Sequence, residues 1–243
     1  MQEKSVKAKS AFLKKMITFL VVFIIIPVLL YLTWRLDSKK YYITSVILII
    51  LSMVPFFLRF EKRKPQAREL VTLAVLCAIA VISRVAFIMV PHFKPMAGII
   101  MIAGLAFGSE VGFFTGAISA FVSNFVFMQG VWTPWQMFAY GIGGFVIGFL
   151  GKTGVLKPGK RIPVAIVGGL VILCLVGPIL DTSSLFTMGI EINMDFVKTT
   201  YMYGLPLNAV HAVATTITLF LLAKPMCEKL DRIKVKYGVM SEE

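Results

Sequence analysis

Residues 16–34 read MITFLVVFIIIPVLLYLTW, an apolar run that begins after two lysines and ends before Arg35. A run of roughly 20 apolar residues is long enough to cross the hydrocarbon core of a bilayer as a helix. It is too long for the apolar region of a signal peptide, and no small cleavage-site residues follow it, so we expect a permanent membrane anchor. Further apolar runs follow, and nearly every charge lies in the gaps between them. The sequence therefore predicts an all-α membrane protein.

The composition supports the same class. Hydrophobic residues make up 58% of the chain, and the mean hydropathy is +0.86. A soluble globule of this composition would have too few polar side chains to cover its surface. The net charge is +13, and the basic residues gather at 1–15, 59–68, 152–161 and 224–236. Because these clusters flank apolar runs, we expect them to contact lipid headgroups, and we expect no nucleic-acid partner.

Eight apolar runs are candidate membrane spans. They lie at about 16–34, 41–58, 70–90, 96–108, 111–128, 136–150, 162–180 and 204–223. Alternate gaps carry 19 Lys and Arg on one side of the membrane and 5 on the other, with Arg84 inside a span. Since Lys and Arg accumulate on the cytoplasmic side, both termini are predicted to be cytoplasmic. The fourth span is short for a full crossing. If it were re-entrant, the basic segment 152–161 would lie outside, so we expect it to cross the membrane.

The charged stretch around residues 59–69 divides the chain. It separates an apolar two-helix hairpin from a six-helix core whose membrane-embedded residues are more varied. We predict an N-terminal leader and hairpin at 1–58, a cytoplasmic linker at 59–69, a substrate-binding core at 70–223 and a cytoplasmic tail at 224–243.

Small residues recur at every fourth position of the core. This spacing lets helix backbones approach closely, which favours association of helices in lipid. The residues concerned are Gly104, Gly108, Gly112, Gly116 and Ala120, followed by Gly144 and Gly148. We interpret them as packing residues of a compact bundle. Ala74 and Ala78 form another such pair on the third span, facing a partner within the chain or in another subunit.

Polar residues of the core spans gather toward the predicted outer face. Amides and charges inside a membrane are costly and normally point into a protein cavity, so they are candidates for a binding site. Aromatic side chains among them would stack on a flat ligand. The candidate substrate-binding residues are Arg84, Lys94, Asn124, Gln129, Trp132, Trp135, Gln136, Tyr140, Asn208 and His211.

Each candidate also has a structural alternative. Arg84 could extend to the outer headgroups, and the asparagines Asn124 and Asn208 could hold helices together by hydrogen bonds. His211 could be an ordinary buried histidine. Trp132 and Trp135 could belong to the aromatic belt, which is the favoured role for Trp135 at the head of a span. Four spans contribute to the group, and this convergence favours a site.

Catalytic patterns fit the sequence poorly. Gly151-Lys152-Thr153 resembles the end of a phosphate-binding loop, but the glycine needed five positions earlier is Val146. The two histidines form no metal-binding motif, and no nucleophile, base and orienting group come together. We therefore predict no catalytic residue, no metal site and no cofactor, and a protein that is not an enzyme.

Two core segments resemble a known family. They are Lys94-Pro-Met-Ala-Gly98 through Gly104-Leu-Ala-Phe-Gly108-Ser-Glu-Val-Gly112, and Gly130-Val-Trp-Thr-Pro-Trp-Gln-Met137. Both are similar to the substrate-binding S components of energy-coupling factor (ECF) vitamin transporters, and most similar to the subgroup associated with cobalamin. The resemblance covers about residues 67–225, and the hairpin at 16–58 departs from it.

The resemblance implies a multi-pass protein of a prokaryotic plasma membrane. It implies capture of a vitamin at the outer face and docking on a membrane T subunit driven by two ABC-type ATPases. Ala74-Val-Leu-Cys-Ala78 occupies the position of the Ala-xxx-Ala motif that meets the T subunit in the family. The loop around Trp132-Thr-Pro-Trp135 would act as a gate. Cobalamin is the favoured vitamin, with the long 181–203 segment helping to form a wide cavity; riboflavin or another small heterocycle is the alternative.

Two other classes of function compete with transport. An intramembrane hydrolase would use Glu110 and His211, but the predicted topology places them near opposite faces. A passive channel would need polar residues through the whole bilayer, and the inner halves of the spans are nearly free of them.

Overall fold

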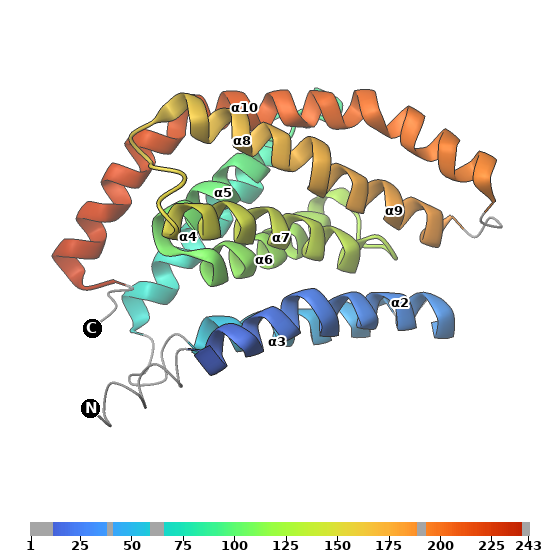
Figure 1. The fold of residues 1–243 in the computed structure, drawn as a ribbon, viewed down its shortest axis with the longest axis horizontal. Coiled ribbons are helices and arrows are strands. Elements are labelled where there is room, and N and C mark those ends of the chain that lie inside the picture. The colour runs from blue at the N-terminus through green and yellow to red at the C-terminus, as the bar shows by residue number, and fades with distance from the viewer. Residues whose placement is uncertain (1–11, 38–40, 59–65, 189–192, 240–243) are drawn as a thin grey trace.

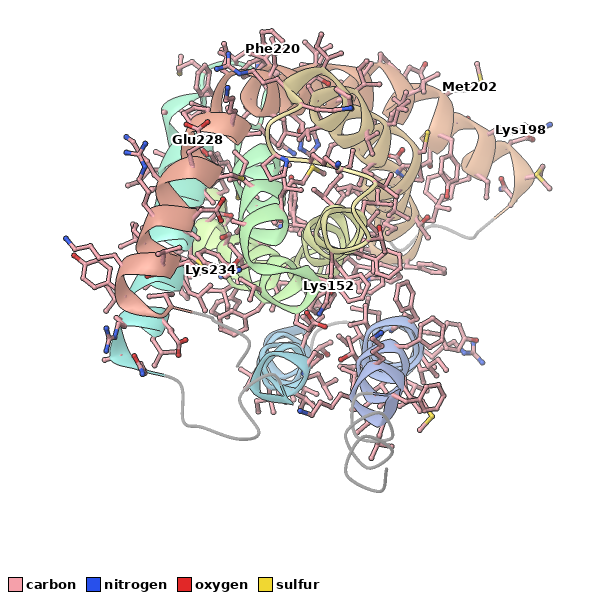
Figure 2. All side chains as sticks on the ribbon, turned by 60° about the vertical axis from the view of Figure 1, so that its left-hand side comes forward. Lys152, Lys198, Met202, Phe220, Glu228 and Lys234 are labelled. Atoms are coloured by element: carbon pink, nitrogen blue, oxygen red, sulfur yellow. The ribbon has the colours of Figure 1, made fainter. Side chains whose placement is uncertain are left out.

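The computed structural model describes residues 12–37, 41–58, 66–188 and 193–239, and within these ranges the chain forms helices and no strand (Figure 1). Among the described residues, five helices are long and apolar enough to cross a membrane. They are Phe12–Leu32, Ala67–Ala86, Ser109–Phe127, Arg161–Thr187 and Met194–Tyr237. Exposed apolar side chains such as Met202 and Phe220 project outward from the last of these (Figure 2). The chain is an all-α membrane protein, as predicted.

The first two helices form an antiparallel hairpin beside the rest of the bundle (Figure 1). The first helix begins at residue 12 and continues through the π-helical segment η1 (Val21–Ile25) into α2 (Ile26–Asp37), and the second is α3 (Tyr41–Leu58). The hairpin packs on α6 and α7. Phe23 meets Phe145 of α7 edge to face, with ring centroids 5.7 Å apart. The hairpin is therefore packed on the core in this structure.

The central helices are α4 (Ala67–Ala86), α5 (Met96–Phe107), α6 (Ser109–Phe127) and α7 (Thr133–Lys152). The short α5, about 18 Å long at 1.5 Å per residue, cannot cross a hydrocarbon core of about 30 Å. Every residue of α5 except Ala106 is buried. It packs against α4, α6, α7 and α10, so the fourth predicted span is a helix enclosed by protein. Enclosure removes the requirement to match the bilayer thickness.

The last two predicted spans are longer than expected. The seventh is a continuous helix of α8 (Arg161–Val171), the π-helical segment η3 (Ile172–Val176) and α9 (Gly177–Thr187). The eighth is α10 (Met194–Tyr237), which includes the predicted tail from residue 224 onward. Figure 1 shows α10 bending toward its red end, and Pro225 lies inside the helix, where it removes a backbone hydrogen bond. The segment predicted as a long loop at 181–203 is thus largely helical.

Glycines bring α5, α6 and α7 into backbone contact, as predicted from their spacing. A Cβ on Gly104 would lie 2.3 Å from the carbonyl oxygen of Gly144, and one on Gly112 would lie 2.4 Å from the same oxygen. Gly148 approaches the backbone of Ser109 in the same way. Gly108 has a different role: its φ of 100° turns the chain sharply between α5 and α6. The small residues therefore set both the packing distance and the turn.

Candidate functional site

Arg84 lies near the end of α4 and points into the bundle. Only 7% of the residue is exposed. Its Nη1 donates hydrogen bonds to the Ser123 hydroxyl and, at 3.0 Å, to Oδ1 of Asn124. The guanidinium also stacks on the ring of Phe127, 4.2 Å from the centroid. Arg84 therefore does not extend to the headgroups, and it ties α4 to α6.

Asn124 is the centre of this hydrogen-bond network. Its Nδ2 donates to Oγ1 of Thr133 at 3.1 Å and to Oε1 of Gln136 at 2.9 Å, both on α7. The residue is 1% exposed. Together with the bond that it accepts from Arg84, Asn124 joins three helices. A buried amide with every group paired is expensive to disturb, which favours a single arrangement of these helices.

The loop between α6 and α7 is held by Thr133 and Gln129. The Thr133 hydroxyl donates to Oε1 of Gln129 at 2.9 Å and accepts from the backbone N–H of Gly130 at 3.1 Å. Nε2 of Gln129 donates to the carbonyl oxygen of Phe121 at 2.9 Å. Ser123 and Thr133 were not among the sequence candidates, although each is adjacent to a residue or motif that was. A serine or threonine in an apolar span does not by itself indicate a site, because its short hydroxyl can bond to the backbone of its own helix.

The two tryptophans have different surroundings. Trp135 stacks on Phe186 of α9, with centroids 5.3 Å apart and rings inclined by 19°. It thus links α7 to α9 and is not simply a belt residue. Trp132 is 40% exposed, and its ring covers Gly130, where a Cβ would lie 2.4 Å from the indole. Trp132 forms the accessible part of the loop.

A second group of polar residues lies on α7, α9 and α10. The ring of His211, 2% exposed, meets the ring of Tyr140 edge to face at 5.8 Å. One turn earlier on α10, Nδ2 of Asn208 donates to Oδ2 of Asp181 at 2.7 Å. Asp181 in turn packs against Gly204, where no Cβ fits. Asn124 and Asn208 are therefore both buried in the bundle, away from lipid.

The loop from residue 87 to 95 brings further positive charge to this group. Lys94, His92 and Arg84 all lie within electrostatic range of His211. Partial burial lowers the pKa of His92, and the neighbouring Lys94 lowers it further. Lys94 itself is partly buried just before α5. The structure thus brings together the predicted residues of α4, α7 and α10 with the charged loop.

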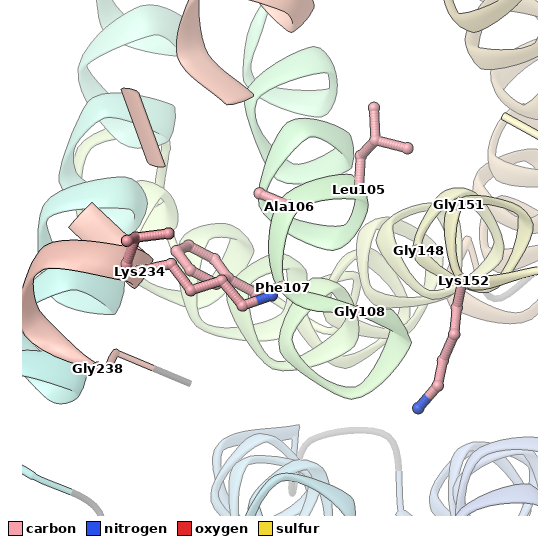
Figure 3. A pocket seen from close by; sticks show the side chains of 10 residues that line it. Leu105, Ala106, Phe107, Gly108, Gly148, Gly151, Lys152, Lys234 and Gly238 are labelled. Carbon is pink, nitrogen blue, oxygen red and sulfur yellow. The ribbon is translucent and has the colours of Figure 1, made fainter. Parts of the chain in front are cut away.

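A cavity of about 650 Å³ lies elsewhere, at the far ends of α5 and α7. Its walls include Gly108, Gly148, Phe107 and two lysines, and none of the predicted substrate-binding residues. In Figure 3 the side chain of Lys234 reaches toward Phe107, whereas Lys152 points away. This cavity is distinct from the network around Asn124.

The partner-binding residues predicted on α4 are both exposed. Ala74 and Ala78 lie on a face of α4 that also exposes Val71, Val75 and Ile82. Leu73, Cys77 and Ala80 fill the opposite, buried face of the helix. Nothing within the described chain covers the small-residue pair, so the first core helix presents an apolar surface toward the membrane.

The arrangement is that of a helical membrane protein with a hydrogen-bond network buried among its helices. A comparison with protein-family models finds the ECF-type riboflavin transporter, S component family, which matches residues 64–228. The match covers more than half of the chain, and the protein belongs to this family of transporter subunits. It is therefore a substrate-capture subunit of an ECF vitamin transporter and not an enzyme. The matched residues do not include the hairpin. The match names riboflavin, so it does not confirm the predicted cobalamin subgroup.

The other two comparisons add no relatives. Neither the curated proteins nor the solved structures include a significant match to this chain. The family implies a small vitamin as substrate, a T subunit and ATPases as partners, and a multi-pass location in a membrane.

Proposed function

We propose that this S component captures a small heterocyclic vitamin, with riboflavin as the first candidate, at the outer end of α4, α6, α7 and α10 in a prokaryotic plasma membrane. The observation that carries the proposal is the polar network centred on Asn124, which joins three helices inside the bundle. Arg84, Tyr140, Asn208 and His211 extend this polar region across the bundle.

The family name favours riboflavin over cobalamin. The shape of the chain supports that preference, because α9 ends at Thr187 and α10 begins at Met194. A long flexible loop was the feature that suited the large cobalamin molecule, and helices occupy most of it. A flat ring system suits Trp132 better, since its indole is 40% exposed at the start of α7 and offers an aromatic face.

We further propose that α4 docks on the T subunit through Ala74 and Ala78. Their exposure among other apolar residues supports this role. Small side chains allow close approach of another membrane helix. The energy for transport would come from the ATPases bound to the T subunit.

A binding measurement with purified protein tests the substrate. Riboflavin fluorescence is quenched on binding, and cobalamin is added as a competitor. We expect saturable riboflavin binding, and Trp132→Ala should weaken it about fivefold if the indole stacks on the ring. Phe149→Ala, an exposed residue at the other end of α7, is the matched control and should leave the Kd unchanged. Saturable binding of cobalamin with no binding of riboflavin would reverse the preference.

A further inference from the structure

Basic side chains collect in the proposed site, and two of them, Arg84 and Lys94, carry the positive charge. Arg84 comes from α4, His92 and Lys94 from the loop before α5, and His211 from α10. Burial is deep for two of them, with 7% exposure for Arg84 and 2% for His211. The three other groups are close enough to act electrostatically on His211. Four basic side chains from three separate segments therefore surround one part of the bundle.

Carboxylates do not balance this charge. The partners of Arg84 are a serine, an asparagine and a phenylalanine ring, and all are neutral. The side-chain partner of Asp181 is the neutral amide of Asn208, and Glu110 accepts a hydrogen bond from Ser109 at the start of α6. Among the described residues, no carboxylate forms an ion pair with Arg84, Lys94 or either histidine.

Two buried nitrogen atoms of this group also lack hydrogen-bond partners. They are Nε of Arg84 and Nε2 of His211. A buried guanidinium without a counter-ion is costly, and the cost is greatest inside a membrane. Arginine and lysine commonly hold carboxylates and phosphates through charge-assisted hydrogen bonds. The missing counter-charge and the unpaired atoms indicate what the ligand supplies.

We propose that the captured vitamin carries an acidic group, a carboxylate or a phosphate, which is received between Arg84, Lys94 and His211. The inference rests on the proposed function, because it assigns the chemistry of the ligand in that same site. Among flavins, we therefore expect flavin mononucleotide, whose phosphate is anionic at neutral pH, to bind more tightly than uncharged riboflavin. The ring would still stack on the aromatic residues, while the acid would neutralise the basic group.

Matched pairs of ligands test the proposal with the full-length protein in detergent. Each pair differs only in the acid: riboflavin and flavin mononucleotide, and nicotinamide and nicotinate. We expect the acidic member of the preferred pair to bind about tenfold or more tightly, the ratio expected for one hydrogen-bonded charge in a buried site. Equal binding of the two members, or tighter binding of the neutral one, overturns the inference.

Charge-removing variants locate the acid. Lys94→Gln should weaken the acidic ligand about tenfold and leave its neutral partner almost unchanged. Lys198→Gln is the control, because Lys198 is exposed on α10 and projects away from the bundle (Figure 2). Arg84→Gln provides a second variant that keeps a donor near Asn124. The melting temperature of each variant is measured beside its binding titration. A variant that melts like the unchanged protein but binds the acid more weakly has lost charge and not its fold.

Ligand release gives an independent answer. The protein is purified from cells, denatured, and the released molecule is analysed by mass spectrometry. An acidic vitamin supports the inference. A neutral vitamin overturns it and leaves the proposed function intact. If no vitamin is released and none binds, the proposed function fails and the inference fails with it.

Discussion

Asn124 shows how much one buried amide can determine. It accepts one hydrogen bond from α4 and donates two to α7, while it belongs to α6. Hydrophobic attraction between helices is absent in lipid, so directed contacts of this kind select the arrangement of the bundle. The same residue lies between Arg84 and the loop that carries Trp132. The residue that joins the helices therefore also lies within the proposed binding site.

Replacing Asn124 by alanine should destabilise the protein. The change removes one of the two hydrogen bonds of Arg84 Nη1 and the donor to Oε1 of Gln136, at a cost of about 1–3 kcal/mol. We expect a melting temperature in detergent about 5 °C lower, with weaker vitamin binding. Val126→Ala, at an exposed position two residues along α6, is the control. If the two variants have the same melting temperature, Asn124 does not organise the bundle.

At the scale of the element, the glycine contacts of α5, α6 and α7 leave no room for side chains. Gly144→Ala would place a methyl group 2.4 Å from the Gly112 carbonyl oxygen. Overpacking of this kind costs about 1–3 kcal/mol, and backbone atoms cannot move aside as a side chain can. We expect a sharp loss of folded protein by size-exclusion chromatography. Gly159→Ala, with no atom within 4 Å of the added carbon, should behave like the unchanged protein.

The exposed face of α4 provides a second prediction at this scale. Ala74→Trp adds a large ring where the T subunit is proposed to approach. Because the position is exposed, the isolated protein should fold and bind its vitamin normally. Co-purification with the T subunit and ATPases should be lost, together with uptake. Val213→Trp, an equally bulky change on the exposed face of α10, should retain both. Retained co-purification of Ala74→Trp would exclude this face as the docking surface.

At the scale of the whole molecule, the distribution of basic residues predicts the orientation in the membrane. Met128 lies in the loop expected outside, and Gly159 lies in the basic loop expected inside. In a variant without the three native cysteines, Met128→Cys should react with an impermeant maleimide on intact cells. Gly159→Cys should react only after the membrane is opened. The reverse pattern would place the proposed site on the cytoplasmic face and contradict vitamin capture from outside.

The hairpin is the other feature of the whole molecule. It lies outside the family match, which starts at residue 64, and packs on α6 and α7 through contacts such as that of Phe23 with Phe145. This placement covers one side of the core while α4 remains exposed. A partner in the membrane therefore has access to the α4 side.

The sequence by itself determined the membrane class, the presence of the apolar helices, though not all their ends, and the close approach of the glycine-rich helices. These follow from local composition and spacing, because lipid forces every spanning backbone into helices and small residues permit contact wherever they align. The sequence also predicted that polar residues concentrate near one end of the core, because the position of each residue along its span gives its depth in the membrane.

Only the tertiary structure decided which side chains meet. Arg84 turns inward because Ser123 and Asn124 lie opposite it, and Trp135 stacks on Phe186 because α9 lies beside α7. The short α5 is tolerated because other helices enclose it. Each of these outcomes depends on the rotation of one helix against another, which is set by the packing of residues far apart in the chain. That packing is not encoded in any single segment.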